Sequence, residues 1–291
     1  MRGILRQSYC RMFSPETRYW LYKIRHLGEF RELVTQCNSS GKGDFSLRGF
    51  AEREAIFVHV TKSAGTSVAT SLFGYLPSHY SAWQYRVIFG KRDFTRYFKF
   101  SFVRNPWDRL YSAFSYLKGG GWDWRDERWF DENLSGVDDF NQFVMEWLTP
   151  ERLHSHVHFW PQSHFIFDKR GNLLIDYLGY FETLGQDFFH IASRINPEAK
   201  LTRTNSSQRG SYLDVYTPEA IAKVEKLYAE DISNFGYSFR GLARKRVVNG
   251  VLVDGDCFGN VPDRVGPISV ARATVDTLVD IAVARKRARR R

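Results

Sequence analysis

The amino-acid sequence predicts an α/β domain of three layers, in which helices cover a central parallel sheet. Two hydrophobic segments, at residues 56–60 and 97–104, have the composition of buried strands, and each is followed by the start signals of an amphipathic helix. This repeated order of strand and helix favours parallel strands. The chain of 291 residues is 43% hydrophobic and 16% aromatic, so it can bury one sizeable core.

The positive charge of the chain is concentrated at its C-terminus. The formal net charge is +10, but residues 285–291 carry six of the positive charges and leave 36 basic against 32 acidic side chains elsewhere. A mildly basic body excludes a dedicated nucleic-acid binder with a basic face, but it allows a local basic cleft for an anionic cofactor or substrate. Three scattered cysteines, Cys10, Cys37 and Cys257, fit a reducing compartment better than a disulfide framework.

We divide the chain into an N-terminal extension over residues 1–50, a folded domain over 51–240 and a C-terminal extension with a basic tail over 241–291. Residues 15–36 predict an amphipathic helix that either packs on the domain or lies on a membrane surface. We favour packing, because its polar face also carries acidic residues. No apolar run reaches the roughly 18 residues of a membrane span and no signal peptide is evident, so we expect a cytoplasmic protein, peripheral to a membrane if that helix lies on one.

The first predicted strand leads into a loop of small residues and then into a helix. Gly65 permits a backbone path closed to other residues, and Thr66 or Ser67 can cap the helix. The helix itself is indicated by apolar residues at helical spacing, namely Val68, Leu72 and Leu76. Such a junction directs backbone N–H groups and the positive end of a helix dipole at one point, and Lys62 adds a mobile cation, so it suits a phosphate.

This loop differs from the usual cradle for nucleoside triphosphates. In that cradle Gly-Lys-Ser/Thr ends the loop and the hydroxyl holds magnesium. Here Lys62 precedes Gly65, and no acidic partner for magnesium ends a strand, so the loop suits a phosphate bound without metal. Viewed alone, an ordinary connection between a strand and a helix is an equally good interpretation.

The second strand repeats this design. Alternating phenylalanines predict a strand that ends at Arg104, and Asn105-Pro106 predicts the N-cap and first position of a helix that Gly119 ends. If the two strands are parallel neighbours, Lys62 and Arg104 converge on one crevice. Ser112, roughly 10 Å along this helix, can then meet a phosphate held by Arg104, although by itself it is typical of an exposed helix serine.

Together, these two motifs resemble the paired signature of sulfotransferases that use 3′-phosphoadenosine 5′-phosphosulfate (PAPS). The resemblance rests on Lys62-Ser63-Ala64-Gly65-Thr66-Ser67 and on Arg104-Asn105-Pro106-Trp107-Asp108-Arg109-Leu110-Tyr111-Ser112. The subtype it resembles is the carbohydrate sulfotransferases with an HxPKTAGTS-like loop. Thr61 departs from the family, which often has proline there; this loosens the entry to the loop but removes no donor.

The resemblance implies a P-loop-like sulfotransferase fold, PAPS as donor, adenosine 3′,5′-bisphosphate (PAP) as product and no metal. It implies that the loop from Lys62 to Ser67 grips the 5′-phosphosulfate while Arg104 and Ser112 hold the 3′-phosphate. Weaker matches follow in the family's order through most of residues 51–240. Among them, a polar loop that touches the 3′-phosphoadenosine in the family makes Asn205, Ser207 and Arg209 candidates, against the alternative of a solvated loop.

Sulfuryl transfer needs an in-line nucleophile, a base and a cation on the leaving phosphate. Lys62 fits the leaving-group role, and the base is a histidine by preference because its pKa lies near neutral pH. His79 lies in the polar loop between the two motifs, where related members place a histidine, so we favour it over the alternative of a surface loop histidine. His164 and Glu182 are reserve candidates for the base.

The remaining histidines have simpler interpretations. His154, His156 and His158 share a face if they form a strand, which would suit metal ligands, but no cysteine or carboxylate motif accompanies them and we expect no metal. His59 alternates with buried residues and is expected to be a core residue. Residues 119–135 predict a long loop, whose Trp122 and Trp124 are candidates for contact with a sugar acceptor, against the alternative that they anchor the loop.

We therefore expect a PAPS-dependent sulfotransferase that modifies a hydroxyl of a carbohydrate or glycan-like acceptor. Two rivals stay open: a P-loop-type nucleotide-dependent kinase, and a non-enzymatic module that binds an anionic polymer through the loop and the basic tail. Elsewhere, residues 165–175 predict two strands, Thr217-Pro218 predicts a helix start, and a hairpin is expected beyond Gly241, before a weak helix over 270–284. The tail over 285–291 suits weak contact with anions, although such ends are usually solvated.

Overall fold

The computed structural model describes residues 46–202 and 210–255, together with the isolated positions Met12, Thr17, Leu21 and Ile24. Several predictions lie outside these residues: most of the helix over 15–36, of which Thr17, Leu21 and Ile24 are helical, the site candidates Asn205, Ser207 and Arg209, the helix over 270–284 and the tail over 285–291.

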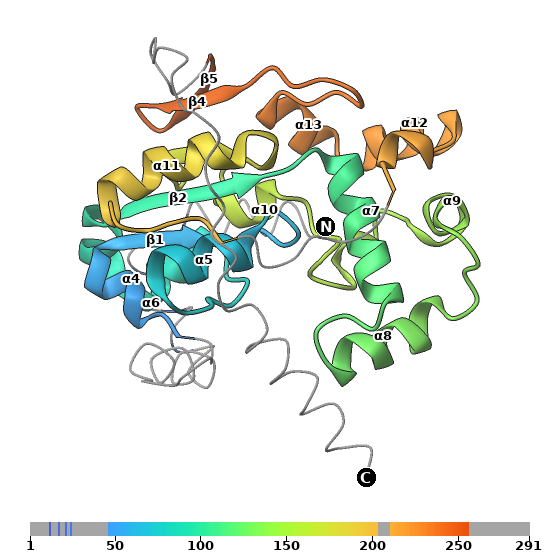
Figure 1. The fold of residues 1–291 in the computed structure, drawn as a ribbon, viewed down its shortest axis with the longest axis horizontal. Helices are drawn as coiled ribbons and strands as arrows, with labels where there is room; N and C mark the ends of the chain where they lie inside the picture. The colour runs from blue at the N-terminus through green and yellow to red at the C-terminus, as the bar shows by residue number, and fades with distance from the viewer. Residues whose placement is uncertain are drawn as a thin grey trace.

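A parallel sheet of three strands forms the centre of the fold. Its order is β1 (Ala55–Val58), β2 (Phe98–Val103) and β3 (Tyr177–Tyr180), with Ala55 paired to Phe98 and Phe100 paired to Tyr177. Every residue of the three strands is buried, as expected for a parallel sheet covered on both faces. Strands β1 and β2 point the same way, and α7 leaves the end of β2 (Figure 1). The predicted α/β fold with a central parallel sheet is confirmed.

The helices of the first half differ from the prediction at their ends. They are α4 (Arg48–Arg53), α5 (Gly65–Phe73), α6 (Ala82–Arg96) and α7 (Pro106–Lys118). Neither Thr66 nor Ser67 caps α5, because the helix begins earlier, after Ala64. It ends at Gly74, whose φ of 74° permits the left-handed turn that leaves Leu76 outside the helix. By contrast, Asn105 caps α7 as predicted.

The second half is more helical than the sequence suggested. Its helices are α8 (Trp124–Leu134), α9 (Phe140–Gln142), α10 (Ser163–Ile166), α11 (Leu184–Ile195), α12 (Pro218–Leu227) and α13 (Ala229–Phe235). The prediction of a long loop over 119–135 was wrong, because most of this segment is α8. Asp123 caps the helix by accepting from the N–H of Arg125, and Leu134 is buried. The prediction of two strands over 165–175 was also wrong, since this segment contains the end of α10 and one isolated antiparallel bridge, Phe167 with Leu173.

Two hydrophobic clusters hold these elements together. One surrounds the sheet and includes Phe57 and Phe100, whereas the other joins α7 to α12 through residues such as Trp107 and Val224. The predicted hairpin is present as β4 (Lys245–Val248) and β5 (Val251–Asp254). Within residues 46–202 and 210–255, none of the helices has both the length and the apolar composition needed to cross a bilayer.

Candidate active site

The loop between β1 and α5 forms the first half of the candidate site. Its backbone turns twice through the left-handed region, at Lys62 (φ 63°) and at Ala64 (φ 62°), before α5 begins at Gly65. The first N–H groups of a helix have no carbonyl partner within the helix, and the helix dipole is positive there. Among the described residues, the buried Ser63 hydroxyl has no hydrogen-bond partner. This end of the loop is therefore chemically suited to an anion.

Gly65 has a different role from the one predicted. Its φ is not positive, but a Cβ added to it would lie 1.7 Å from Nε2 of His59. His59 is buried and stacks on Phe57, with ring centroids 5.4 Å apart. The expectation that His59 is a core residue is thus confirmed. Its ring also packs against the start of α5, so only glycine fits at position 65.

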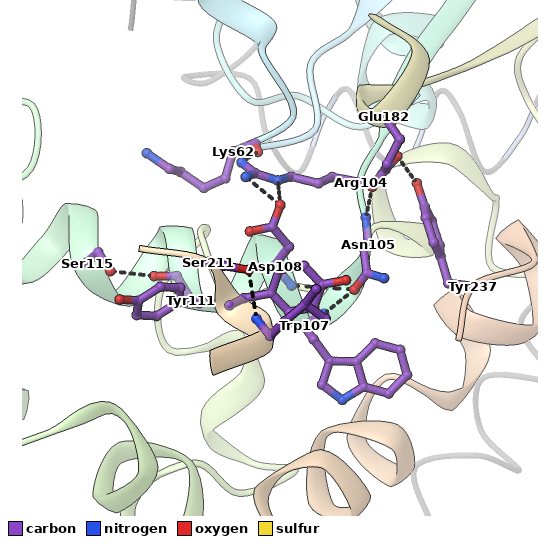
Figure 2. A network of polar contacts seen from close by, with 12 residues as sticks. Lys62, Arg104, Asn105, Trp107, Asp108, Tyr111, Ser115, Glu182, Ser211 and Tyr237 are labelled. Atoms are coloured by element: carbon purple, nitrogen blue, oxygen red, sulfur yellow. Dashed lines mark hydrogen bonds and ion pairs between the residues drawn. The ribbon is translucent and has the colours of Figure 1, made fainter. Parts of the chain in front are cut away.

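Arg104 reaches the loop from the end of β2. Its Nη1 donates to the carbonyl oxygen of Lys62 at 3.0 Å, and its guanidinium lies 3.9 Å from the ring centroid of Phe181. Asp108, one turn into α7, accepts from Nε of Arg104 at 2.7 Å. Figure 2 shows this guanidinium beside the backbone of Lys62, whose side chain extends the other way. The two strand ends therefore meet at one place.

The start of α7 is fixed by a network around Asn105. The side chain of Asn105 accepts from the N–H of Trp107 at 3.1 Å, and the backbone N–H of Asn105 donates to Glu182 at 2.8 Å. The other carboxylate oxygen of Glu182 accepts from the Tyr237 hydroxyl at 2.9 Å (Figure 2). Burial raises the pKa of Glu182. With both oxygens engaged, Glu182 supports the loop that bears Arg104. Ser112, two turns along α7, is buried rather than exposed.

His79 is oriented by one hydrogen bond to the backbone. Its Nδ1 lies 3.2 Å from the carbonyl oxygen of His59. Because a carbonyl can only accept, this contact assigns the proton to Nδ1 and leaves the lone pair on Nε2. Burial lowers the pKa of His79 to about 4, and the nearby charge of Lys62 acts in the same direction. The imidazole is therefore neutral at neutral pH, but its pKa lies well below the near-neutral value that made histidine the preferred base.

A cluster around Lys62 was missed at the sequence level. The Lys62 ammonium lies 3.6 Å from the ring centroid of Tyr116, four residues beyond Ser112 on α7. Asp126 on α8 contacts Nε2 of His156 at 3.3 Å, and Nδ1 of His156 accepts from the N–H of His158 at 3.3 Å. The i, i+4 spacing from Ser112 was a usable signal for Tyr116, whereas nothing in the sequence connects Asp126 with His156.

The remaining candidates from the sequence are the metal ligands, His164 and the two tryptophans. Among the described residues no group of histidine, cysteine or carboxylate side chains is arranged to hold a metal ion. His164 is exposed, and its ring contacts those of His154 and Trp160. Trp122 and Trp124 are 54% and 53% exposed at the start of α8. Trp122 precedes α8, Trp124 is its first residue, and both are partly exposed to solvent.

Comparisons with known proteins agree with this geometry. A family model described as "Sulfotransferase family" matches residues 52–238, which is more than half of the chain and includes both strand ends and both helix starts. An uncharacterized protein of Archaeoglobus fulgidus is 29% identical over 134 residues, which cover 45% of this chain and 95% of that protein. No solved structure matches the chain.

Proposed function

Because this chain belongs to the sulfotransferase family, we propose that it transfers a sulfuryl group from PAPS to a hydroxyl of a carbohydrate or glycan-like acceptor. The observation that carries the proposal is the contact between the strand ends, in which Nη1 of Arg104 donates to the carbonyl oxygen of Lys62 at 3.0 Å. This contact supports the proposal because it sets an arginine beside a loop and a helix start that suit an anion, as a nucleotide with two phosphate groups would require.

In this proposal each part of the site has one task. The loop from Lys62 to Ser67 binds the 5′-phosphosulfate, and Arg104 and Ser112 bind the 3′-phosphate. The S–O bond to the 5′-phosphate breaks as a new S–O bond to the acceptor oxygen forms, and Nε2 of His79 takes the hydroxyl proton. Lys62 stabilises the negative charge that builds up on the leaving PAP. No step needs a metal ion.

The acceptor is proposed to approach along the start of α8. Trp122 and Trp124 are exposed there, and an indole face suits the apolar face of a sugar ring. A chain of contacts connects Trp122 to Lys62. The N–H of Trp122 donates to Asp126 at 2.8 Å, Asp126 is hydrogen-bonded to Tyr116, and the Tyr116 ring centroid lies 3.6 Å from the Lys62 ammonium. Asn205, Ser207 and Arg209 are retained as proposed contacts of the adenosine portion, and the tail over 285–291 as a proposed weak contact with anions.

The test is incubation with sulfur-labelled PAPS and a panel of glycans in the presence of a chelator. We expect label transfer by the wild type, weaker donor binding in Arg104→Ala, and slow turnover with near-normal donor binding in His79→Ala. Asp131→Asn, an exposed change on α8, serves as the control. A requirement for magnesium and ATP would instead identify a kinase. If the full chain transfers no label but binds an anionic polymer, and deletion of residues 285–291 abolishes that binding, the chain is a polymer-binding module.

A further inference from the structure

The guanidinium of Arg104 is already bound to a carboxylate of its own chain. Both Nε and Nη2 of Arg104 contact the same oxygen of Asp108, at 2.7 and 2.6 Å. The two side chains are only 10% and 16% exposed, so water screens this pair less than a surface pair. Figure 2 shows the Asp108 carboxylate directly below the Arg104 guanidinium.

The edge of Arg104 that Asp108 occupies is the one that suits an oxyanion. A guanidinium binds phosphate through two parallel N–H groups, and the pair formed by Nε and Nη2 is one such fork. On the other side, Nη1 donates to Lys62, and the ring of Phe181 lies against the guanidinium at 3.9 Å from its centroid. A phosphate that binds at this fork therefore replaces Asp108, or shares the arginine with it at the cost of repulsion between two anions.

Asp108 also has a second source of stabilisation that does not depend on Arg104. It lies in the first turn of α7, where the helix dipole favours an acidic side chain. The carboxylate therefore keeps a favourable location when Arg104 turns to another anion. Asp108 can therefore bind Arg104 while no phosphate is bound and release it to a phosphate. This competition lowers the affinity of Arg104 for the phosphate.

We propose that Asp108 is an internal competitor of the 3′-phosphate, which weakens the hold of Arg104 on the nucleotide and so helps the product PAP to leave. This inference rests on the proposed function, because it takes the 3′-phosphate to bind at Arg104. Asp108 is thereby a specificity-determining residue, since it sets how strongly the protein distinguishes a 3′,5′-bisphosphate from a 5′-monophosphate.

The experiment compares two ligands, bound to the wild type and to five variants, by calorimetric titration. The ligands are PAP and adenosine 5′-monophosphate, which lacks the 3′-phosphate. The proteins are the wild type, Asp108→Asn, Arg104→Ala and the double variant, with Asp131→Asn as a control that makes the same change in net charge on exposed α8. Asp108→Ser is prepared as a second neutral variant, in case asparagine disturbs the start of α7.

We expect Asp108→Asn to bind PAP about three- to tenfold more tightly than the wild type, because the substitution removes both a like charge and a competitor for the arginine fork. The affinity for the monophosphate should stay within about twofold, as in Asp131→Asn. In the Arg104→Ala background Asp108→Asn should raise PAP affinity by a smaller factor, because the competition requires the arginine and only the removal of a like charge remains.

Two results would overturn the inference alone. A selective loss of PAP affinity in Asp108→Asn would show that Asp108 holds Arg104 in place for the phosphate, and equal changes for both ligands would show a general effect on α7. If neither the wild type nor Asp108→Asn binds PAP better than the monophosphate, the placement of the 3′-phosphate on Arg104 is wrong, and the proposed function and this inference fail together.

Discussion

Replacement of His79 by asparagine should reduce the acid sensitivity of the fold. The side-chain amide of asparagine can replace Nδ1–H as donor to the carbonyl of His59, but it does not titrate. In the native protein burial lowers the pKa of His79 from 6.5 to about 4. Above pH 6.5 the group is neutral in both states and has no effect. Below that value the unfolded chain binds a proton that the folded chain does not, so stability falls as the pH falls.

The size of this effect follows from the two pKa values. Between pH 7.5 and pH 5, His79 alone should lower the free energy of unfolding by about 2 kcal/mol. Burial also lowers the pKa of His59 and His158. The free energy of unfolding of the wild type should therefore fall by more than this amount. The difference in this fall between wild type and His79→Asn gives the contribution of His79 alone.

The assay is urea unfolding followed by tryptophan fluorescence at several pH values, with His164→Asn as a matched control because His164 is exposed. The variant should lose about 2 kcal/mol less than the wild type over this range. Parallel pH curves for wild type and His79→Asn would refute the neutral state of the partly buried His79 and the argument that its Nε2 can act as a base.

Three further substitutions test the architecture of the site. Gly65→Ala should cost about 1–3 kcal/mol in thermal unfolding, because the new Cβ meets the ring of His59; an unchanged melting temperature would show that the ring moves freely. Asn105→Ala should cost about 1–2 kcal/mol through loss of the α7 cap, and urea unfolding that matches the wild type would argue against that cap. Asp126→Asn should lower the free energy of unfolding by about 1–3 kcal/mol, because it weakens the contacts to His156 and Trp122. If Asp126→Asn unfolds in urea like the wild type and like the control Asp131→Asn, these contacts do not stabilise the fold.

The parts of the site that depend on local sequence could be predicted. Asn105-Pro106 specifies a helix start through its own side chain and its fixed φ, so the position of Arg104 beside that start followed from a few neighbouring residues. Strands β1 and β2 followed in the same way from hydrophobic segments that precede helix starts, whereas β3 was not predicted. In both cases the signal and the structure lie within the same ten or so residues.

The parts that depend on tertiary packing could not be predicted. Glycine is needed at position 65 because the ring of His59 packs against it. The sequence alone does not show how the loop between these two residues folds, so this contact could not be foreseen. The contact of Asp126 with His156 joins α8 to a loop 30 residues further along. Helix α8 itself was mistaken for a loop because Gly119-Gly120-Gly121 and the charged residues after it suggested an irregular segment.

Calorimetric titration of PAP against wild type and Arg104→Ala, with a chelator present, tests most directly whether the two strand ends hold one nucleotide. The wild type should prefer PAP over adenosine 5′-monophosphate by about ten- to a hundredfold, and Arg104→Ala should lose that preference while its affinity for the monophosphate is kept. Equal binding of both nucleotides by the wild type, or full retention of the preference without Arg104, would contradict the account.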